Sequence, residues 1–425
     1  MSTTDPSSQV LSKVEARVAE LAQTNVSSPE TDAAPAAEEH PIWSRLNELG
    51  TELWLDTGDM DDADRLWSAE FTALTTNNTL LSKEVAKGIY DHVIQSAVRE
   101  LRELAPEVDD ETLVAEVGIL LNAHHGLRLV ERFGCRVSVE LHTDLAHDLE
   151  GSLRVGRRLH AVCPTHFIVK VPLTPTGILV ARRLVNESIP VNFTLEFSAR
   201  QNYVVARLAN PDYVNVFLGR LNSFVADHGL GDGRMVGEKA TLASQRALLE
   251  LRQHGGQTRQ IAASMREAEQ VLALAGVDVF TMPIAVAEGM PDLGADPTRI
   301  ESQIESDPAI RIGSEADPAV LEALWEVPGQ LKATVEALSR EDLDNFTGEQ
   351  LADFLRQRGH GDLFPRWSEA DLANIDADGK IPSYPRWRDV MEAGEVGLDA
   401  ALNAAGMASF AVDQRALDDR IRSFL

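Results

Sequence analysis

The chain is poor in cysteine, in basic residues and in long apolar runs, and each shortage argues against a class of protein. Its 425 residues include only Cys135 and Cys163, which give no disulfide framework and indicate a reducing compartment such as the cytoplasm. Lys and Arg number 39 against 67 Asp and Glu, a formal net charge of -28 that argues against nucleic acid or an anionic membrane as a partner. No apolar run reaches membrane-spanning length, and no secretory signal is present at the N-terminus.

The acidic balance does not exclude an anionic substrate. Charges farther apart than roughly 8 Å are screened at physiological salt, so a local group of arginines decides whether a phosphate binds. The sequence does not fix the oligomeric state, and a homodimer is compatible with it.

Three parts of the chain differ in composition. Residues 1–39 are rich in Ser, Thr, Ala, Pro and acids, which predicts a largely disordered acidic tail with one short amphipathic helix over 10–21. Residues 40–290 alternate between strand-like and helix-like patterns. Residues 291–425 predict a helical extension packed on this middle part, with helices over 319–338, 348–358 and 412–425.

The alternation in the middle part predicts a parallel α/β barrel. The expected strands cover residues 52–56, 73–77, 136–141, 167–171, 191–196, 213–217, 260–264 and 277–282. Helical patterns lie between most of them, at 84–104, 148–160, 177–187 and 265–275. Eight such units within about 250 residues are typical of a (β/α)8 TIM barrel. An open doubly wound sheet is the alternative, but no glycine-rich dinucleotide turn follows the first strand.

One predicted strand, Phe-Ile-Val-Lys-Val-Pro at residues 167–172, contains a lysine in an otherwise apolar run. Burial disfavours an ammonium and favours the neutral amine, which attacks carbonyls and forms Schiff bases. Lys170 is therefore a candidate nucleophile. The alternative is a lysine at a strand end whose ammonium reaches water along its apolar stem.

Polar side chains follow the other predicted strands at their carboxyl ends, where barrel enzymes place their sites. Singly, such residues are ordinary helix caps and turn formers. Class I aldol chemistry requires a lysine, a group that moves protons during imine formation, a second carboxylate for carbon–carbon cleavage, and donors that hold the substrate. The candidates for these roles are Lys170, Glu140, Asp56, Asn77, Asn192 and Thr194, with Arg220, Ser264 and Arg266 for a phosphate.

The ordered set of motifs resembles the transaldolase family over residues 42–283, and the last helix resembles the family's more loosely. The matching segments are Trp54-Leu55-Asp56-Thr57-Gly58, Thr75-Thr76-Asn77, Val139-Glu140, Ile168-Val169-Lys170-Val171-Pro172, Val191-Asn192-Phe193-Thr194-Leu195-Glu196-Phe197-Ser198, Phe217-Leu218-Gly219-Arg220 and Ala263-Ser264-Met265-Arg266.

The resemblance implies a class I aldolase barrel that moves a dihydroxyacetone unit between sugar phosphates in the pentose phosphate pathway. It implies that Lys170 forms the Schiff base, that Asp56 is the acid and base for cleavage, and that Glu140 and Thr194 hold a catalytic water. The residues it implies for substrate binding are Asn77, Asn192, Asn215, Phe217, Arg220, Ser264 and Arg266. No metal ion or organic cofactor is required.

Several positions depart from the family pattern. Asn78 replaces a common proline, Asn215 replaces a common serine, Val139 replaces a frequent threonine, and Glu196 adds an acid. The alternative function is a family aldolase that releases dihydroxyacetone or acts on a modified sugar phosphate. In that branch a glutamine and a tyrosine tend to stand where this chain has Glu140 and Phe217, which favours transfer. A third interpretation is a catalytically silent barrel that binds sugar phosphates or a protein partner.

No metal site is predicted. Residues 374–379 resemble the first half of a calcium loop, but Pro385 stands where a bidentate glutamate is needed, so a simple turn is expected.

Overall fold

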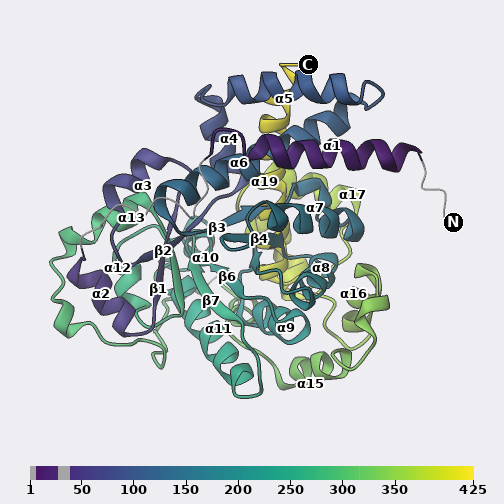
Figure 1. Ribbon diagram of the computed structural model, residues 1–425. Coiled ribbons are helices and arrows are strands. Elements are labelled where there is room, and N and C mark those ends of the chain that lie inside the picture. Colours follow the sequence, from purple (N-terminus) through teal and green to yellow (C-terminus); the bar gives the residue numbers. More distant parts are fainter. Residues whose placement is uncertain (1–5, 27–38, 315) are drawn as a thin grey trace.

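Eight parallel strands pair in chain order into a closed barrel, and β8 returns to pair with β1 (Figure 1). The computed structural model describes residues 6–26, 39–314 and 316–425. The strands are β1 (Glu52–Asp56), β2 (Phe71–Thr75), β3 (Arg136–Glu140), β4 (Phe167–Pro172), β5 (Val191–Thr194), β6 (Tyr213–Phe217), β7 (Arg259–Ala263) and β8 (Val279–Pro283). The predicted TIM barrel is confirmed, and the ends of every predicted strand lie within two residues of the observed ones.

Helices surround the barrel on its outer side (Figure 1). They are α2 (Pro41–Glu48), α3 (Met60–Leu66), α4 (Asn78–Ala86), α5 (Asp91–Leu104), α6 (Asp110–Phe133), α7 (Leu149–Val162), α8 (Pro175–Asn186), α9 (Ala199–Ala209), α10 (Leu218–Asp227), α11 (Val236–Arg252), α12 (Glu269–Ala273) and α13 (Ile284–Gly289). The helix predicted over 84–104 is two helices, α4 and α5. Gly88 separates them with a φ of +80°, a left-handed conformation that glycine adopts without strain.

The interior of the barrel is filled at its amino end. Trp54 packs edge-on against Tyr213, with ring centroids 4.7 Å apart. Below them Glu52 accepts hydrogen bonds from the Trp54 indole at 2.8 Å and from the guanidinium groups of Arg136 and Arg259. Burial opposes the charge of Glu52, but Arg136, the hydrogen bonds from Trp54 and Thr72, and Arg259 together outweigh burial and lower the pKa of this carboxyl.

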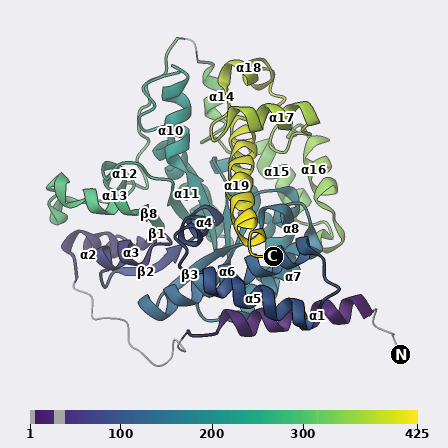
Figure 2. The ribbon, with the colours of Figure 1, turned by 90° about the horizontal axis from the view of Figure 1, so that it is seen from above.

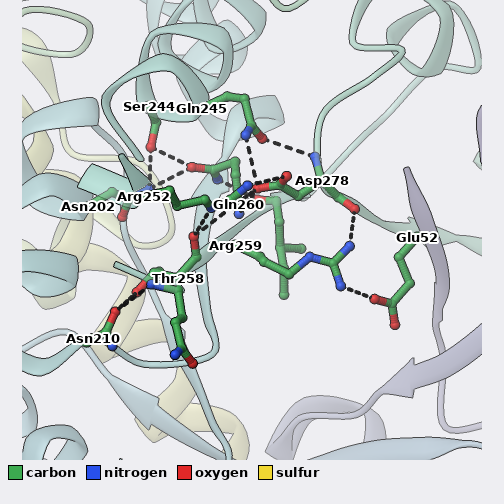
Figure 3. A network of polar contacts seen from close by, with 12 residues as sticks. Glu52, Asn202, Asn210, Ser244, Gln245, Arg252, Thr258, Arg259, Gln260 and Asp278 are labelled. Atoms are coloured by element: carbon green, nitrogen blue, oxygen red, sulfur yellow. Dashed lines mark hydrogen bonds and ion pairs between the residues drawn. The ribbon is translucent and has the colours of Figure 1, made fainter. Parts of the chain in front are cut away.

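The floor of the barrel continues into a second polar group around Asp278 (Figure 3). Its carboxylate accepts from Gln245 at 3.0 Å, from the Gln260 backbone at 2.9 Å and from Arg252. These hydrogen bonds pair the Asp278 carboxylate and close the amino end of the barrel. A catalytic site is therefore expected at the carboxyl end.

The first half of the tail is ordered around the amphipathic helix predicted there. Helix α1 (Pro6–Ala22) packs against α5 and α6, and its Val14, Val18 and Leu21 are buried there. These residues share one face at helical spacing, and their burial outweighs the polar composition of the tail. The amphipathic helix predicted over 10–21 lies within α1. Residues 1–5 and 27–38 lie outside the described residues.

The C-terminal extension is helical, as predicted. It contains α14 (Pro318–Glu322), α15 (Gly329–Leu338), α16 (Gly348–Arg356), α17 (Glu369–Asp378), α18 (Tyr384–Glu392) and α19 (Leu398–Arg422). The helix predicted over 319–338 is therefore two, and the one predicted over 412–425 begins 14 residues earlier, at Leu398. Residues 374–378, the start of the calcium-like segment, form the end of α17 rather than a turn.

The long helix α19 lies across the carboxyl end of the barrel. It packs against α4, α6 and α17, and Figure 2 shows it in yellow across the middle of the molecule. The Asn403 amide donates to the backbone oxygens of Leu173 at 3.1 Å and Leu195 at 2.9 Å, just after β4 and β5. No helix among the described residues is long and apolar enough to cross a membrane.

Candidate active site

Strand register brings the candidate nucleophile beside a carboxyl. Glu140 on β3 pairs with Lys170 on β4, which pairs with Asn192 on β5. The Lys170 amine donates to the Thr76 backbone oxygen at 3.3 Å and lies 3.9 Å from Glu140 Oε1. Lys170 is only 5% exposed, so its ammonium does not reach water along its stem, and the alternative of a strand-end lysine does not hold.

Asp56, at the end of β1, is held from the neighbouring strand. Its Oδ1 accepts from the Thr75 hydroxyl at 2.8 Å, and that hydroxyl lies 2.6 Å from the hydroxyl of Thr281 on β8. Burial raises the pKa of Asp56, and Lys170 is the strongest of the groups that oppose the rise. A raised pKa suits a carboxyl that acts as acid and base for bond cleavage.

Glu140 is oriented by two amides. Its Oε2 accepts from the backbone N–H of Asn78 at 3.1 Å, and its backbone oxygen accepts from the Asn122 side chain at 2.7 Å. Burial raises the pKa of Glu140, while Lys170 and the Asn78 N–H oppose the rise. The bond from Asn78 was not anticipated, and proline at this position could not make it because proline has no N–H.

A row of amides follows on the next two strands. Asn192 donates to the Ser138 hydroxyl at 3.0 Å, and its oxygen accepts from the Asn215 amide at 2.8 Å. Thr194 is fully buried, and its hydroxyl has no hydrogen-bond partner among the described residues. Asn77 caps α4, since its side-chain oxygen accepts from Leu80 N at 2.9 Å, and only its amide nitrogen remains for a substrate.

Two arginines come together beyond β6 and β7. A Cβ on Gly219 would lie 2.1 Å from the Ser264 backbone oxygen and 2.9 Å from the Arg266 side chain, so only glycine at this position allows the two loops to approach so closely. Burial lowers the pKa of Arg220 to about 10, and the like charge of Arg266 acts in the same direction. The buried Nη1 of Arg220 has no partner within the described part of the chain. A desolvated guanidinium beside a second one is suited to an anion such as phosphate.

Aromatic rings enclose this arginine. The Arg220 guanidinium lies 5.7 Å from the ring centroid of Phe217 and 5.8 Å from that of Phe410 on α19. Asp413, one turn further along α19, accepts from the Thr79 hydroxyl in α4. The terminal helix α19 thus forms one wall of the site. The sequence indicated this helix only through its loose resemblance to the last helix of the family.

Every residue predicted for the site lies on β1–β7 or within three residues after one of these strands. The structure places Lys170, Glu140 and Asp56 near one another, and it places Arg220 near Arg266. Their individual roles stay predictions. Among the described residues, no group of three His, Cys, Asp or Glu side chains is arranged to hold a metal ion.

A closed (β/α)8 barrel with a buried lysine between carboxyls is the arrangement of a class I, Schiff-base-forming aldolase. The family described as transaldolase/fructose-6-phosphate aldolase matches residues 53–352. The chain belongs to this family.

Individual relatives agree with the family match. The transaldolase of Xanthomonas euvesicatoria pv. vesicatoria (strain 85-10) is 28% identical over 321 residues, which cover 72% of this chain and 98% of the relative. A probable transaldolase of Kosmotoga olearia (strain ATCC BAA-1733 / DSM 21960 / TBF 19.5.1) is 34% identical over 216 residues, 50% of this chain and 84% of the relative.

Proposed function

We propose that this enzyme is a transaldolase. It transfers a dihydroxyacetone unit from a ketose phosphate, sedoheptulose 7-phosphate or fructose 6-phosphate, to an aldose phosphate through a Schiff base on Lys170. The observation that supports this most is the buried amine of Lys170, 3.9 Å from Glu140 and within electrostatic reach of Asp56. A silent barrel has no use for a buried lysine beside the buried carboxyl of Glu140 and the half-buried carboxyl of Asp56, since charged groups are costly to desolvate.

The reaction divides into two halves. The Lys170 amine attacks the ketone, Glu140 moves the protons, and water leaves to give an iminium ion. Asp56 then removes the proton of the C4 hydroxyl, two carbons from the iminium carbon. The C3–C4 bond breaks, C4 becomes the aldehyde carbon of the aldose phosphate, and the electron pair of the broken bond moves into the iminium to form an enamine. The aldose phosphate leaves, another binds, and the same steps run in reverse. Because the protonated imine accepts the electron pair, the proposal includes no metal ion or organic cofactor.

Transfer requires that the enamine survive until the acceptor arrives. Phe217, Phe410 and the helix α19 around Arg220 limit the access of water to this end of the site. On this proposal the reaction belongs to the pentose phosphate pathway in the cytoplasm.

A coupled assay with fructose 6-phosphate, run with and without erythrose 4-phosphate, tests the proposal. We expect glyceraldehyde 3-phosphate only when the acceptor is present, with sedoheptulose 7-phosphate in equal amount. Turnover without acceptor, with release of dihydroxyacetone, would contradict transfer and establish the aldolase alternative. No turnover in either assay, together with no borohydride trapping, would favour a binding protein.

The arginine pair yields a second prediction. Arg220→Ala should raise the KM for phosphorylated sugars by about 10- to 100-fold, because one or two charge-assisted hydrogen bonds are lost. The KM for unphosphorylated dihydroxyacetone should change far less. The steady-state kinetics of both substrates measure this difference.

Arg157→Ala is the matched control, because Arg157 lies on α7 and its exposed guanidinium pairs with Glu187. It should leave both KM values unchanged. An equal response of phosphorylated and unphosphorylated substrates to Arg220→Ala would show that Arg220 is not a phosphate ligand.

A further inference from the structure

The segment that follows β2 contacts both members of the Lys170–Glu140 pair through its backbone. The Thr76 backbone oxygen accepts from the Lys170 amine at 3.3 Å. Two residues further on, the Asn78 N–H donates to Glu140 Oε2 at 3.1 Å. One backbone group thus meets the nucleophile and the other meets the carboxyl beside it, so this short segment can fix the geometry of the pair.

The segment is itself fastened to β3 at both ends. The Thr76 N–H and hydroxyl both donate to the Ser138 backbone oxygen, at 3.2 and 2.9 Å. The Asn78 side chain donates to the Leu141 backbone oxygen at 3.2 Å. Thr76 and Asn78 are buried, which shields these bonds from water. Because β3 also carries Glu140, the Asn78 N–H and the carboxyl that it binds are held on one frame.

The bond from Asn78 distinguishes the two oxygens of the Glu140 carboxyl. Oε2 accepts the Asn78 N–H, whereas Oε1 accepts no hydrogen bond from the described residues and lies 3.9 Å from the Lys170 amine. That separation is longer than a hydrogen bond, so the two charged groups attract each other without being joined directly. Oε1 is therefore the oxygen left to exchange protons with the atoms that form the imine.

The Asn78 N–H also favours the charged form of Glu140. Burial raises the pKa of Glu140, and Lys170 on β4 and the Asn78 N–H oppose this rise. The charge of Asp56 on β1 adds to it. Among the described residues, Lys170 and Asp56 are the charged groups that act on this carboxyl; Asn122 on α6, which binds the Glu140 backbone oxygen, is uncharged. Loss of the Asn78 N–H should therefore raise the pKa of Glu140 further.

We propose that Asn78 is a positioning residue for imine formation: its backbone N–H holds Glu140 Oε2, so that Oε1 faces Lys170 as the oxygen that takes up and returns protons. This inference rests on the proposed function, because imine formation is a step of that reaction. It assigns Asn78 a role through Glu140 and no contact with the reacting atoms.

The proton balance of imine formation defines the task of Oε1. Starting from the Lys170 ammonium and the Glu140 carboxylate, Oε1 takes one proton, and the nitrogen lone pair attacks the ketone carbon. Oε1 takes a second proton from the nitrogen after the C–N bond has formed. Each proton passes in turn to the ketone oxygen, which leaves as water with the electron pair of the C–O bond, while the freed nitrogen lone pair forms the C=N bond of the iminium.

Proline and alanine in place of Asn78 separate the N–H from the side chain. Asn78 is the first residue of α4, a position that suits proline, and Asn77 before it is extended, which suits a residue that precedes proline. Both variants lose the side-chain bond to Leu141, but only Asn78→Pro loses the N–H.

The acidic limb of kcat/KM for fructose 6-phosphate reports the proton that the Lys170–Glu140 pair takes up in the free enzyme. Asn78→Pro should move this limb to higher pH by about one unit, the effect of losing one hydrogen bond to a charged group. In Asn78→Ala the limb should stay at its wild-type position, whatever the height of the profile.

Glu369→Pro is the matched control, because Glu369 is the exposed first residue of another helix, α17. It should leave the pH profile as in wild type. A wild-type profile in Asn78→Pro, or an equal shift in Asn78→Pro and Asn78→Ala, would overturn the proposal.

A measurement on the wild-type protein keeps the test decisive if Asn78→Pro does not fold. In NMR spectra of protein grown with isotope-labelled asparagine, the backbone amide signal of Asn78 is the one that disappears in Asn78→Ala. Its proton shift should change over the same pH range as the acidic limb, because its acceptor gains a proton there. A signal that does not change would overturn the proposal. Failure of borohydride trapping in wild type would instead refute the proposed function, and the amide signal would still report the bond to Glu140.

Discussion

Replacing Lys170 with alanine is expected to abolish turnover, with kcat lower by on the order of 10⁴-fold or more, the scale at which loss of a covalent nucleophile acts. Borohydride reduction in the presence of fructose 6-phosphate should no longer add the sugar-derived mass to the protein. Mass spectrometry of the intact protein and its peptides measures this directly.

The variant should remain folded. Burial raises the pKa values of Asp56 and Glu140 and the Lys170 charge opposes that rise, so loss of the cation shifts both carboxyls toward their uncharged forms. Circular dichroism and the thermal midpoint check this.

Lys332→Ala is the matched control, since Lys332 on α15 lies outside the barrel and pairs with Glu250. Borohydride reduction of the Lys332→Ala variant should give the same amount of sugar adduct as wild type. A sugar adduct that persists in Lys170→Ala would mean that another lysine is the nucleophile.

The strands were predictable because they are short, largely apolar runs, and most have polar residues at or just after their carboxyl ends. β1 and β6 begin and end where the sequence indicated. Once eight strands close into a barrel, their carboxyl ends share one rim, and this places Lys170, Glu140 and Asp56 together without further information.

Contacts that depend on backbone groups or on a distant helix were not predictable. The N–H of Asn78 that orients Glu140 carries no side-chain signature in the sequence. Phe410 reaches Arg220 only because α19 crosses the barrel, and residues 398–411 gave no clear amphipathic pattern that would mark this helix. The sequence did indicate α1 through its apolar residues at helical spacing, but the polar composition of the tail gave no sign that this helix packs against the barrel.

The position of α19 depends on a buried ion pair at its first turn. Asp399 is fully buried and accepts from the Ser198 hydroxyl at 2.6 Å and from Arg200 at 2.7 and 2.8 Å. Arg200 also donates to Asp362 at 2.6 Å. Ser198 caps α9, two residues after Glu196, so this cluster ties the terminal helix to the loop that follows β5.

Asp399→Ala is therefore expected to lower the free energy of unfolding by about 3–5 kcal/mol, because it leaves a buried arginine with one of its two carboxylates and removes the acceptor of the Ser198 hydroxyl. Urea denaturation measures the loss. Hydrogen exchange should show faster exchange along α19, and activity should fall because the helix carries Phe410 and Asn403 onto the site.

Asp419→Ala on the same helix is the matched control. Asp419 is largely exposed and pairs with the partly exposed Arg422 one turn away, an arrangement that contributes at most about 1 kcal/mol. Each variant replaces one aspartate of α19 with alanine, and the two aspartates differ in burial and in their partners. Equal unfolding midpoints for both would show that the buried pair does not hold α19, and the helix would then owe its place to the apolar contacts of Leu402, Ala405 and Phe410.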